Sequence, residues 1–225
     1  MMRILEPEVM DTARDAAEYD AMDFSESDTR FAEDALALVA GRPGAELLDI
    51  GTGTAKIPVI MLDRRADLQV LAIDLSNEML HVATRNVAKA GHGSACRLAK
   101  HDAKALRLSE KRYDLVMSNS VTHHIPDPIV HFQEIARVVR SDGAVLIRDL
   151  LRPATMDDAW GIVKRVAAGE HIRQQQLFFD SLCAALTLSE VEDLVSRAGL
   201  GRMRVAKISD RHWTAERSAF RARAG

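Results

Sequence analysis

The sequence predicts an α/β protein with a doubly wound sheet of about seven strands, mostly parallel, with helices on both faces. Three observations support this fold class. Short apolar runs alternate with helix-length segments between residues 45 and 150. A glycine-rich turn follows the first of these runs, and two alternating segments near the C-terminus suggest an antiparallel hairpin. With 225 residues, of which 47% are hydrophobic, the chain can build one sizeable core.

The predicted strands are short apolar runs, the composition expected of strands buried on both faces of a parallel sheet. They cover residues 46–50, 68–74, 95–100, 113–118 and 143–150. Segments with helical spacing separate or flank them, with Ser76 and Ser189 as expected N-caps. These helices cover residues 29–40, 55–64, 76–90, 128–139 and 189–198.

The alternation stops after residue 150. Residues 151–187 read as helical and contain no predicted strand. Residues 202–208 and 213–218 alternate apolar and polar side chains on either side of a polar turn. We therefore expect an antiparallel C-terminal hairpin strand in an otherwise parallel sheet.

Charge and cysteine content restrict the class of partner. The 30 basic and 33 acidic residues give a net charge of −3, which provides no general attraction to nucleic acid or anionic lipid. Cys96 and Cys183 are not spaced as a metal or disulfide pair and fit a reducing compartment. The N-terminus lacks a signal-peptide pattern, and no apolar run approaches the ~18 residues of a membrane span. We expect a cytoplasmic protein without nucleic-acid or membrane partners, either a monomer or a homodimer.

The most informative motif is the stretch from Leu47 to Ala55, LLDIGTGTA. A strand ends in an acid, Asp49, and a turn containing Gly51 and Gly53 opens the next helix. Glycines let the backbone turn sharply and approach a ligand, and the helix N-terminus presents unpaired N–H groups. A dinucleotide site would want a third glycine where this chain has Lys56. This departure weakens an NAD(P)-dependent oxidoreductase but leaves it as an alternative.

The succession of motifs resembles the class I S-adenosylmethionine-dependent methyltransferases, which have a Rossmann-like fold. An acid ends each of the next two strand regions, in AIDLS (residues 72–76) and KHDA (residues 100–103). The fourth strand gives YDLVMSNS (residues 113–120), followed by VTHHIPDP (residues 121–128). The resemblance covers residues 45–150 by motif and 189–218 by topology. It implies S-adenosylmethionine as cofactor and S-adenosylhomocysteine as product.

The resemblance also assigns roles. The first turn would hold the amino acid end of the cofactor, Asp74 the ribose, Asp102 the adenine, and Asn119 and Ser120 the pocket floor. The full predicted cofactor set is Asp49, Gly51, Thr52, Gly53, Asp74, Leu75, Met79, Asp102, Ala103, Asn119 and Ser120.

Three residues are candidates for catalysis. His123 and His124 follow the fourth strand, and either imidazole could remove a proton from an acceptor because its ordinary pKa is near 6.5. Packing at the pocket is the alternative role. Asp149 ends the fifth strand and could face the acceptor. Adjacent histidines with no carboxylate at metal spacing predict no metal site.

The acceptor is expected to be a small molecule. Candidate contacts are Tyr19, Arg148, Arg152 and Phe178, although the arginines could equally form an internal ion pair and Phe178 could lie on a packing helix. Asn119 is not followed by the Pro-Pro-aromatic sequence typical of enzymes that methylate nucleic-acid amino groups. A non-catalytic protein that binds S-adenosylmethionine remains a further alternative.

These predictions combine into one methyltransferase domain over residues 1–225. Its expected parts are an N-terminal helical cap (1–44), a cofactor-binding core (45–150), a helical insertion or lid (151–187), and a C-terminal helix with a β-hairpin (188–225).

Overall fold

The sheet places β1 at its centre, between β2 and β4. The computed structural model describes residues 1–6 and 12–220, and within these ranges seven strands form one sheet in the order β3-β2-β1-β4-β5-β7-β6. The strands are β1 (Glu46–Ile50), β2 (Gln69–Asp74), β3 (Cys96–Lys100), β4 (Tyr113–Asn119), β5 (Val139–Leu150), β6 (Arg204–Lys207) and β7 (His212–Arg217). Neighbours are parallel except where β7 pairs with β5 and β6. The predicted fold class is confirmed.

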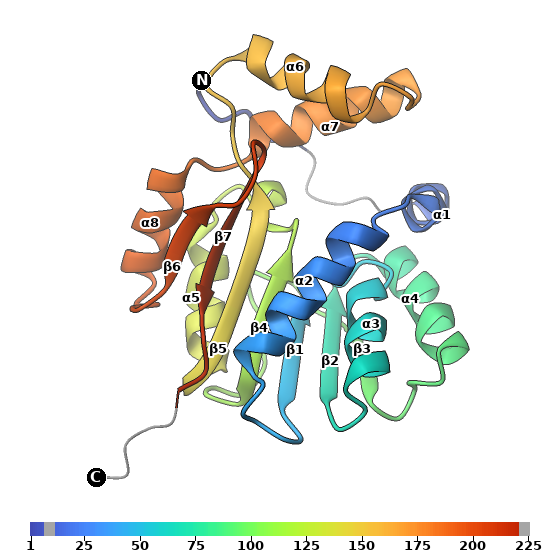
Figure 1. Ribbon diagram of the computed structural model, residues 1–225, viewed down its shortest axis with the longest axis vertical. Coiled ribbons are helices and arrows are strands. Elements are labelled where there is room, and N and C mark those ends of the chain that lie inside the picture. Colours follow the sequence, from blue (N-terminus) through green and yellow to red (C-terminus); the bar gives the residue numbers. More distant parts are fainter. Residues whose placement is uncertain (7–11, 221–225) are drawn as a thin grey trace.

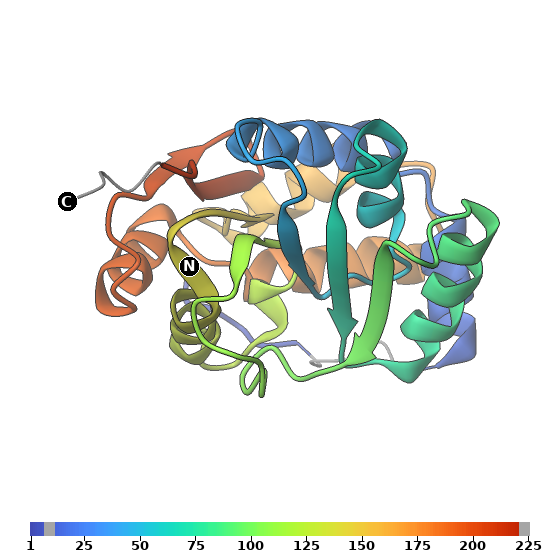
Figure 2. The ribbon, with the colours of Figure 1, turned by 90° about the horizontal axis from the view of Figure 1, so that it is seen from below.

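Helices cover both faces of the sheet (Figures 1 and 2). They are α1 (Ala13–Ala21), α2 (Ser25–Leu38), α3 (Lys56–Arg64), α4 (Asn77–Lys89), the 3₁₀ turn η1 (Thr122–His124), α5 (Ile129–Val138), α6 (Met156–Val166), α7 (Ile172–Ala184) and α8 (Leu188–Arg197). Side chains of α2, α3 and α4 share one core with the sheet, and those of α5 and α8 share the other. Consecutive strand residues feed opposite cores, as Leu47 and Leu48 do.

The end of the sheet to which the parallel strands point is covered by additional helices. In Figure 1 the arrowheads of β1, β2 and β5 point toward the part of the molecule that holds α1, α6 and α7. Helix α6 begins at a Thr155 capping box with Asp158 and packs along α7. Apolar side chains from both helices and from Leu150 form a small separate core. These helices therefore border the edge where ligands bind in open parallel sheets.

Most element boundaries agree with expectation, with three local differences. Helix α2 begins at Ser25 and not at residue 29, and β5 begins at Val139 and not at residue 143. The prediction that Ser189 caps the last helix is wrong. Thr187 is the cap, because its side chain accepts from the Glu190 N–H while Glu190 returns a bond to the Thr187 N–H.

Among the described residues, no helix combines the length and the apolar composition needed to cross a membrane. Both cysteines are buried and unpaired.

We expect the packing of α2 on the sheet to depend on Phe31. Its side chain is 0% exposed, whereas Phe24, at the start of the same helix, is 36% exposed. Phe31→Ala should lower the free energy of unfolding by about 3–5 kcal/mol through lost burial and a residual cavity. Phe24→Ala is the control and should cost about 1 kcal/mol or less. Guanidinium denaturation measures both, and equal losses would show that Phe31 does not anchor the helix.

Candidate functional site

A pocket of about 130 Å³ lies where β1, β2 and β4 end. We call it the sheet-edge pocket. Its lining comes from α1, the turn after β1, the residues after β2 and β3, and the loop after β4. The lining residues are Tyr19, Ile50, Gly51, Gly53, Asp74, Leu75, Ser76, Met79, His101, Asp102, Ala103, Ser120, Val121, His124 and Ile125.

The turn after β1 requires glycine for two reasons. Gly51 has φ +73°, in the left-handed region that disfavours other residues. A Cβ built on Gly51 would lie 2.2 Å from Val121 Cγ2. Gly51 N–H and Thr52 N–H both donate to the Ile73 carbonyl at 2.8 Å, which fixes the turn to β2. The turn is thus held against both neighbouring strands.

Asp74 sits at the end of β2 and faces this turn. Its Oδ2 accepts from Gly53 N–H at 2.8 Å, and its Oδ1 accepts from Ser76 N–H at 2.9 Å. Burial raises its pKa above the ordinary value, although these backbone donors oppose the rise. The carboxylate therefore joins the glycine turn to the start of α4 and borders the pocket.

Asp49 is a buried acid that lacks a compensating positive group. It is 2% exposed, and its Oδ2 has no hydrogen-bond partner among the described residues. Burial, reinforced by the charges of Asp74 and Asp28, raises its pKa to about 7. An isolated buried carboxylate is costly, so this site favours a cationic ligand group.

Two further predicted residues border the pocket from β3 and β4. Asp102 follows β3, and Lys104 holds its pKa below the ordinary value even though burial acts in the opposite direction. Ser120 follows β4 with φ +57°, an unfavourable conformation for a residue with a side chain. This conformation lets the chain turn from β4 into η1. Backbone strain of this kind concentrates at functional sites.

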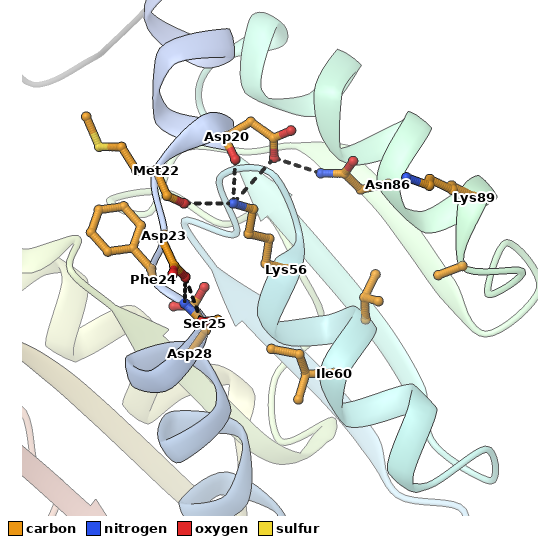
Figure 3. A pocket seen from close by; sticks show the side chains of 12 residues that line it. Asp20, Met22, Asp23, Phe24, Ser25, Asp28, Lys56, Ile60, Asn86 and Lys89 are labelled. Atoms are coloured by element: carbon orange, nitrogen blue, oxygen red, sulfur yellow. Dashed lines mark hydrogen bonds and ion pairs between the residues drawn. The ribbon is translucent and has the colours of Figure 1, made fainter.

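Helix α1 covers the pocket through Tyr19. A Cβ on Gly53 would lie 3.5 Å from Tyr19 Cε1, so the phenol ring lies directly over the glycine turn. Lys56 ties the end of α1 to α3: its Nζ donates to the carbonyls of Asp20 at 2.5 Å and Met22 at 3.2 Å (Figure 3). The residue that breaks the dinucleotide pattern is thus a clamp for the N-terminal helix.

A second hollow of about 500 Å³ adjoins this clamp, between the α1–α2 connection and helices α3 and α4 (Figure 3). None of the predicted site residues lines it, although Asp28, whose charge acts on Asp49, does.

The histidine pair forms a buried cluster with two acids. His123 Nδ1 lies 2.5 Å from Asp149 Oδ1, and Asp149 Oδ2 accepts from the His123 N–H at 3.1 Å. Burial lowers the pKa of His123, but Asp149 and Glu6 outweigh it and the pKa is raised overall. For Asp149, burial acts to raise the pKa and His123 to lower it, with a net lowering. Only His124 of the pair lines the pocket.

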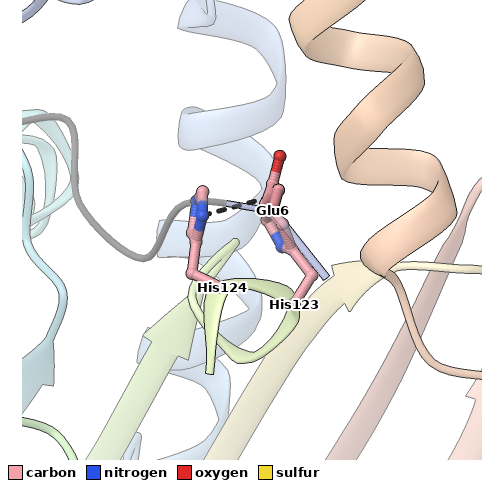
Figure 4. A group of neighbouring side chains, drawn as sticks. All are labelled: Glu6, His123 and His124. Carbon is pink, nitrogen blue, oxygen red and sulfur yellow. Dashed lines mark ion pairs between the residues drawn. The ribbon is translucent and has the colours of Figure 1, made fainter. Parts of the chain in front are cut away.

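The second acid of the cluster is Glu6, which no local sequence signal pointed to. Its Oε1 lies 3.4 Å from His123 Nε2 and 3.1 Å from His124 Nδ1 (Figure 4). Arg3 holds the segment in place through bonds to the carbonyls of His123, Ile125, Pro126 and Ala184. The N-terminus thus supplies the carboxylate that the sequence near the histidines lacked.

The predicted acceptor contacts are spread out. Arg148 pairs with Asp34 at 2.6 Å, and Arg152 pairs with Glu190 at 2.7 Å, so both arginines take the internal ion-pair alternative. Phe178 packs with the small core of α6 and α7. Of this predicted set, the structure brings only Tyr19 to the pocket.

The cofactor set is gathered more closely. Eight of its members line the pocket: Gly51, Gly53, Asp74, Leu75, Met79, Asp102, Ala103 and Ser120. Asp49 is buried within β1, and Thr52 and Asn119 are not part of the lining. Sequence reasoning missed the lining residues Ile50, Ser76, His101, Val121 and Ile125. Each of them is adjacent in the sequence to a predicted site residue. Their position at or just after a strand end was therefore the signal that could have identified them.

The chain is similar to known methyltransferases. A family profile described as "Methyltransferase domain" matches residues 48–147. The chain is 27% identical over 170 residues to the methyltransferase GfsG of Streptomyces halstedii, which covers 74% of this chain and 56% of that protein. It is 25% identical over 216 residues to the demethylmenaquinone methyltransferase of Desulfitobacterium hafniense (strain Y51), covering 89% and 85% of the two chains.

The fold is shared with solved structures. A SAM-dependent methyltransferase from Aquifex aeolicus superimposes with a TM-score of 0.65 at 18% identity, over 93% of this chain and 99% of that one. The matched profile, the named relatives and this shared fold agree with the strand order and with the glycine turn. These findings support the predicted resemblance to class I S-adenosylmethionine-dependent methyltransferases, with residues 48–147 as the part that the methyltransferase-domain profile matches.

Proposed function

We propose that this protein transfers the methyl group of S-adenosylmethionine to a small-molecule acceptor. The observation that carries the proposal is the acid-bordered glycine turn at the centre of the sheet edge. Asp49, Asp74 and Gly51 meet there, with a buried carboxylate that lacks a cation. S-Adenosylmethionine carries an ammonium and a sulfonium, which are the charges such a site favours. A nicotinamide dinucleotide carries anionic phosphates that this acidic edge disfavours.

The residues fit the cofactor in three parts. Asp49 and the turn of Gly51, Thr52 and Gly53 would hold its amino acid end. Asp74 would accept hydrogen bonds from the ribose hydroxyls, and Asp102 would meet the adenine amino group. The remaining contacts would come from Leu75, Met79, Ala103, Asn119 and Ser120.

The bound cofactor supplies an electrophilic methyl group on its sulfonium. The protein must align a nucleophile in line with that methyl and exclude water. Tyr19 lies over the glycine turn and Lys56 holds its helix in place, so α1 serves as the cover. The acceptor side is the wall formed by Val121, His124 and Ile125, with His123 and Asp149 behind it as positioning groups.

The relatives support a small-molecule acceptor without fixing the target atom. One is named for demethylmenaquinone, and others are named for 27-O-demethylrifamycin SV and for malonyl-[acyl-carrier protein]. Since the chain spans 56% of GfsG and 61% of the rifamycin methyltransferase, their own substrates do not carry over. The net charge of −3 agrees with an acceptor other than nucleic acid.

We further propose a cytoplasmic enzyme that works as a monomer or homodimer. Two buried, unpaired cysteines support a reducing compartment.

Asp74→Ala should weaken cofactor binding, because ribose hydroxyls lose their acceptor and the glycine turn loses a tether. We expect a loss of about 1–3 kcal/mol in binding S-adenosylhomocysteine, or roughly 5- to 150-fold in Kd. Isothermal titration calorimetry measures the affinity. Asp63→Ala, an exposed aspartate outside the pocket, is the control and should bind like the native protein. Unchanged affinity in Asp74→Ala would remove this residue from the site.

Asp49→Asn should make the protein more stable as pH rises, and it should also weaken cofactor binding. With its pKa raised to about 7, native Asp49 keeps a proton that the unfolded chain releases, so its contribution to stability is lost as pH rises from about 4 to 7. The asparagine cannot ionise, and its advantage in unfolding free energy should therefore grow by about 2–3 kcal/mol between pH 5 and pH 8.

The same variant should bind S-adenosylhomocysteine more weakly at pH 8, because the ammonium loses its carboxylate. Guanidinium denaturation and calorimetry at the two pH values measure both quantities, with Asp157→Asn, at an exposed position on α6, as control. A stability difference that does not change with pH would contradict the assigned burial of charge.

The acceptor can be identified directly. Metabolite extracts incubated with methyl-labelled cofactor and the enzyme should yield a labelled product whose mass gives the acceptor class. Cofactor binding without turnover on any extract would favour a non-catalytic binding protein.

A further inference from the structure

Three groups capable of binding a metal converge behind the pocket wall. Glu6 Oε1 lies 3.4 Å from His123 Nε2 and 3.1 Å from His124 Nδ1, and the three atoms all lie within 4.8 Å of one another. Zinc–nitrogen and zinc–oxygen bonds of about 2.1 Å place ligand atoms of a tetrahedral site about 3.4 Å apart. The two measured separations are close to that spacing. Figure 4 shows the carboxylate beside both rings, which come from consecutive residues of η1.

The facing atoms of Glu6 and His124 form a close ion pair without a hydrogen bond of good geometry. Glu6 Oε1 and His124 Nδ1 are both buried, and neither has a hydrogen bond of acceptable geometry among the described residues. Their 3.1 Å separation is therefore an approach without a directed bond. Buried polar atoms are nearly always satisfied, so a pair left in this state calls for an explanation such as an ion between them.

The other atoms of two of these ligands are held by outer partners. His123 Nδ1 meets Asp149 Oδ1 at 2.5 Å, which leaves Nε2 free to face Glu6. Ser181 Oγ donates to Glu6 Oε2 at 2.9 Å, which leaves Oε1 for the histidines. A carboxylate behind a ligating histidine, and a donor behind a ligating carboxylate, are the usual supports of a metal site. The cluster has both.

We propose that Glu6, His123 and His124 bind one divalent transition-metal ion of the zinc type. Two imidazole nitrogens and one carboxylate oxygen suit such a cation. Three protein ligands leave a fourth position, which is the arrangement of a catalytic site; structural zinc sites are closed by four.

The fourth coordination position of the proposed ion would face the sheet-edge pocket. His124 is the ligand that also lines the sheet-edge pocket, next to Val121 and Ile125. An acceptor in that pocket could offer an oxygen or nitrogen lone pair to the ion. Coordination would lower the pKa of an acceptor hydroxyl and orient it toward the methyl group. This role rests on the proposed methyl transfer, whereas metal binding itself does not.

The first test uses the full chain, stripped with a chelator and dialysed. Titration with Zn²⁺ should show one site per chain. Titration with Co²⁺ should give visible absorption bands of a four- or five-coordinate ion, which report histidine and carboxylate ligation in solution. The absence of stoichiometric zinc binding, or a cobalt spectrum of the hexa-aqua ion alone, would overturn the proposal.

The second test identifies the ligands. Glu6→Gln and His124→Gln should each weaken Zn²⁺ binding by at least about 10- to 100-fold. A loss of that size is typical even when the mutated residue only hydrogen-bonds to a metal ligand. Glu78→Gln and His81→Gln are matched controls, because half-buried Glu78 and exposed His81 form a Glu–His pair 3.8 Å apart on α4. The controls should keep native zinc affinity, and equal effects in both pairs would refute the assignment. Circular dichroism checks folding, and the cobalt spectrum of the native chain stands even if a variant unfolds.

Failure of this inference can be told apart from failure of the proposed function. Calorimetry with S-adenosylhomocysteine tests the cofactor site independently of zinc. A chain that binds the nucleoside but no zinc overturns only the metal site, and one that binds zinc but no nucleoside overturns only the methyltransferase proposal.

Discussion

Strand β1 pairs in parallel with β2 on one side and β4 on the other, and the geometry of the site follows from this pairing. Parallel strands end at the same edge, so the glycine turn, Asp74 and the loop after Asn119 meet there, and the Asp74 side chain accepts a hydrogen bond from Gly53 N–H. The approach is close enough that Val121 occupies the space a Cβ of Gly51 would need. Glycine is required there by its positive φ and by this contact, and neither neighbour can move independently.

The concentration of acid at this edge has an energetic consequence. Asp49, Asp28 and Asp74 lie near one another in partial or full burial, and burial raises the pKa of each. Lys56 offsets part of this for Asp28, but Asp49 has no positive group acting on it among the described residues, and holding its charge opposes folding and favours a positively charged ligand. The covering Tyr19 and the clamp at Lys56 act in the same sense, since they keep water from the acids.

The histidine–acid cluster is assembled from parts of the chain that are far apart. Arg3 spans the loop after η1 and the end of α7, and in doing so carries Glu6 to the histidines. Asp149 reaches the same cluster from β5. The sheet-edge pocket is therefore formed by the strand ends, while the histidine cluster beside it depends on how the N-terminal segment packs against them.

Local patterns in the sequence were enough to predict the sheet, the position of the glycine turn and most of the residues that line the sheet-edge pocket. Each of these depends on short-range periodicity, or on which residue ends a strand. The sequence also left Arg148 and Arg152 open between acceptor contact and ion pair. Only the tertiary structure decided that question, because Asp34 and Glu190 come from α2 and α8. The same holds for Glu6, which lies more than a hundred residues from His123 in the chain. Contacts of that kind follow from packing of whole elements, and no local pattern encodes them.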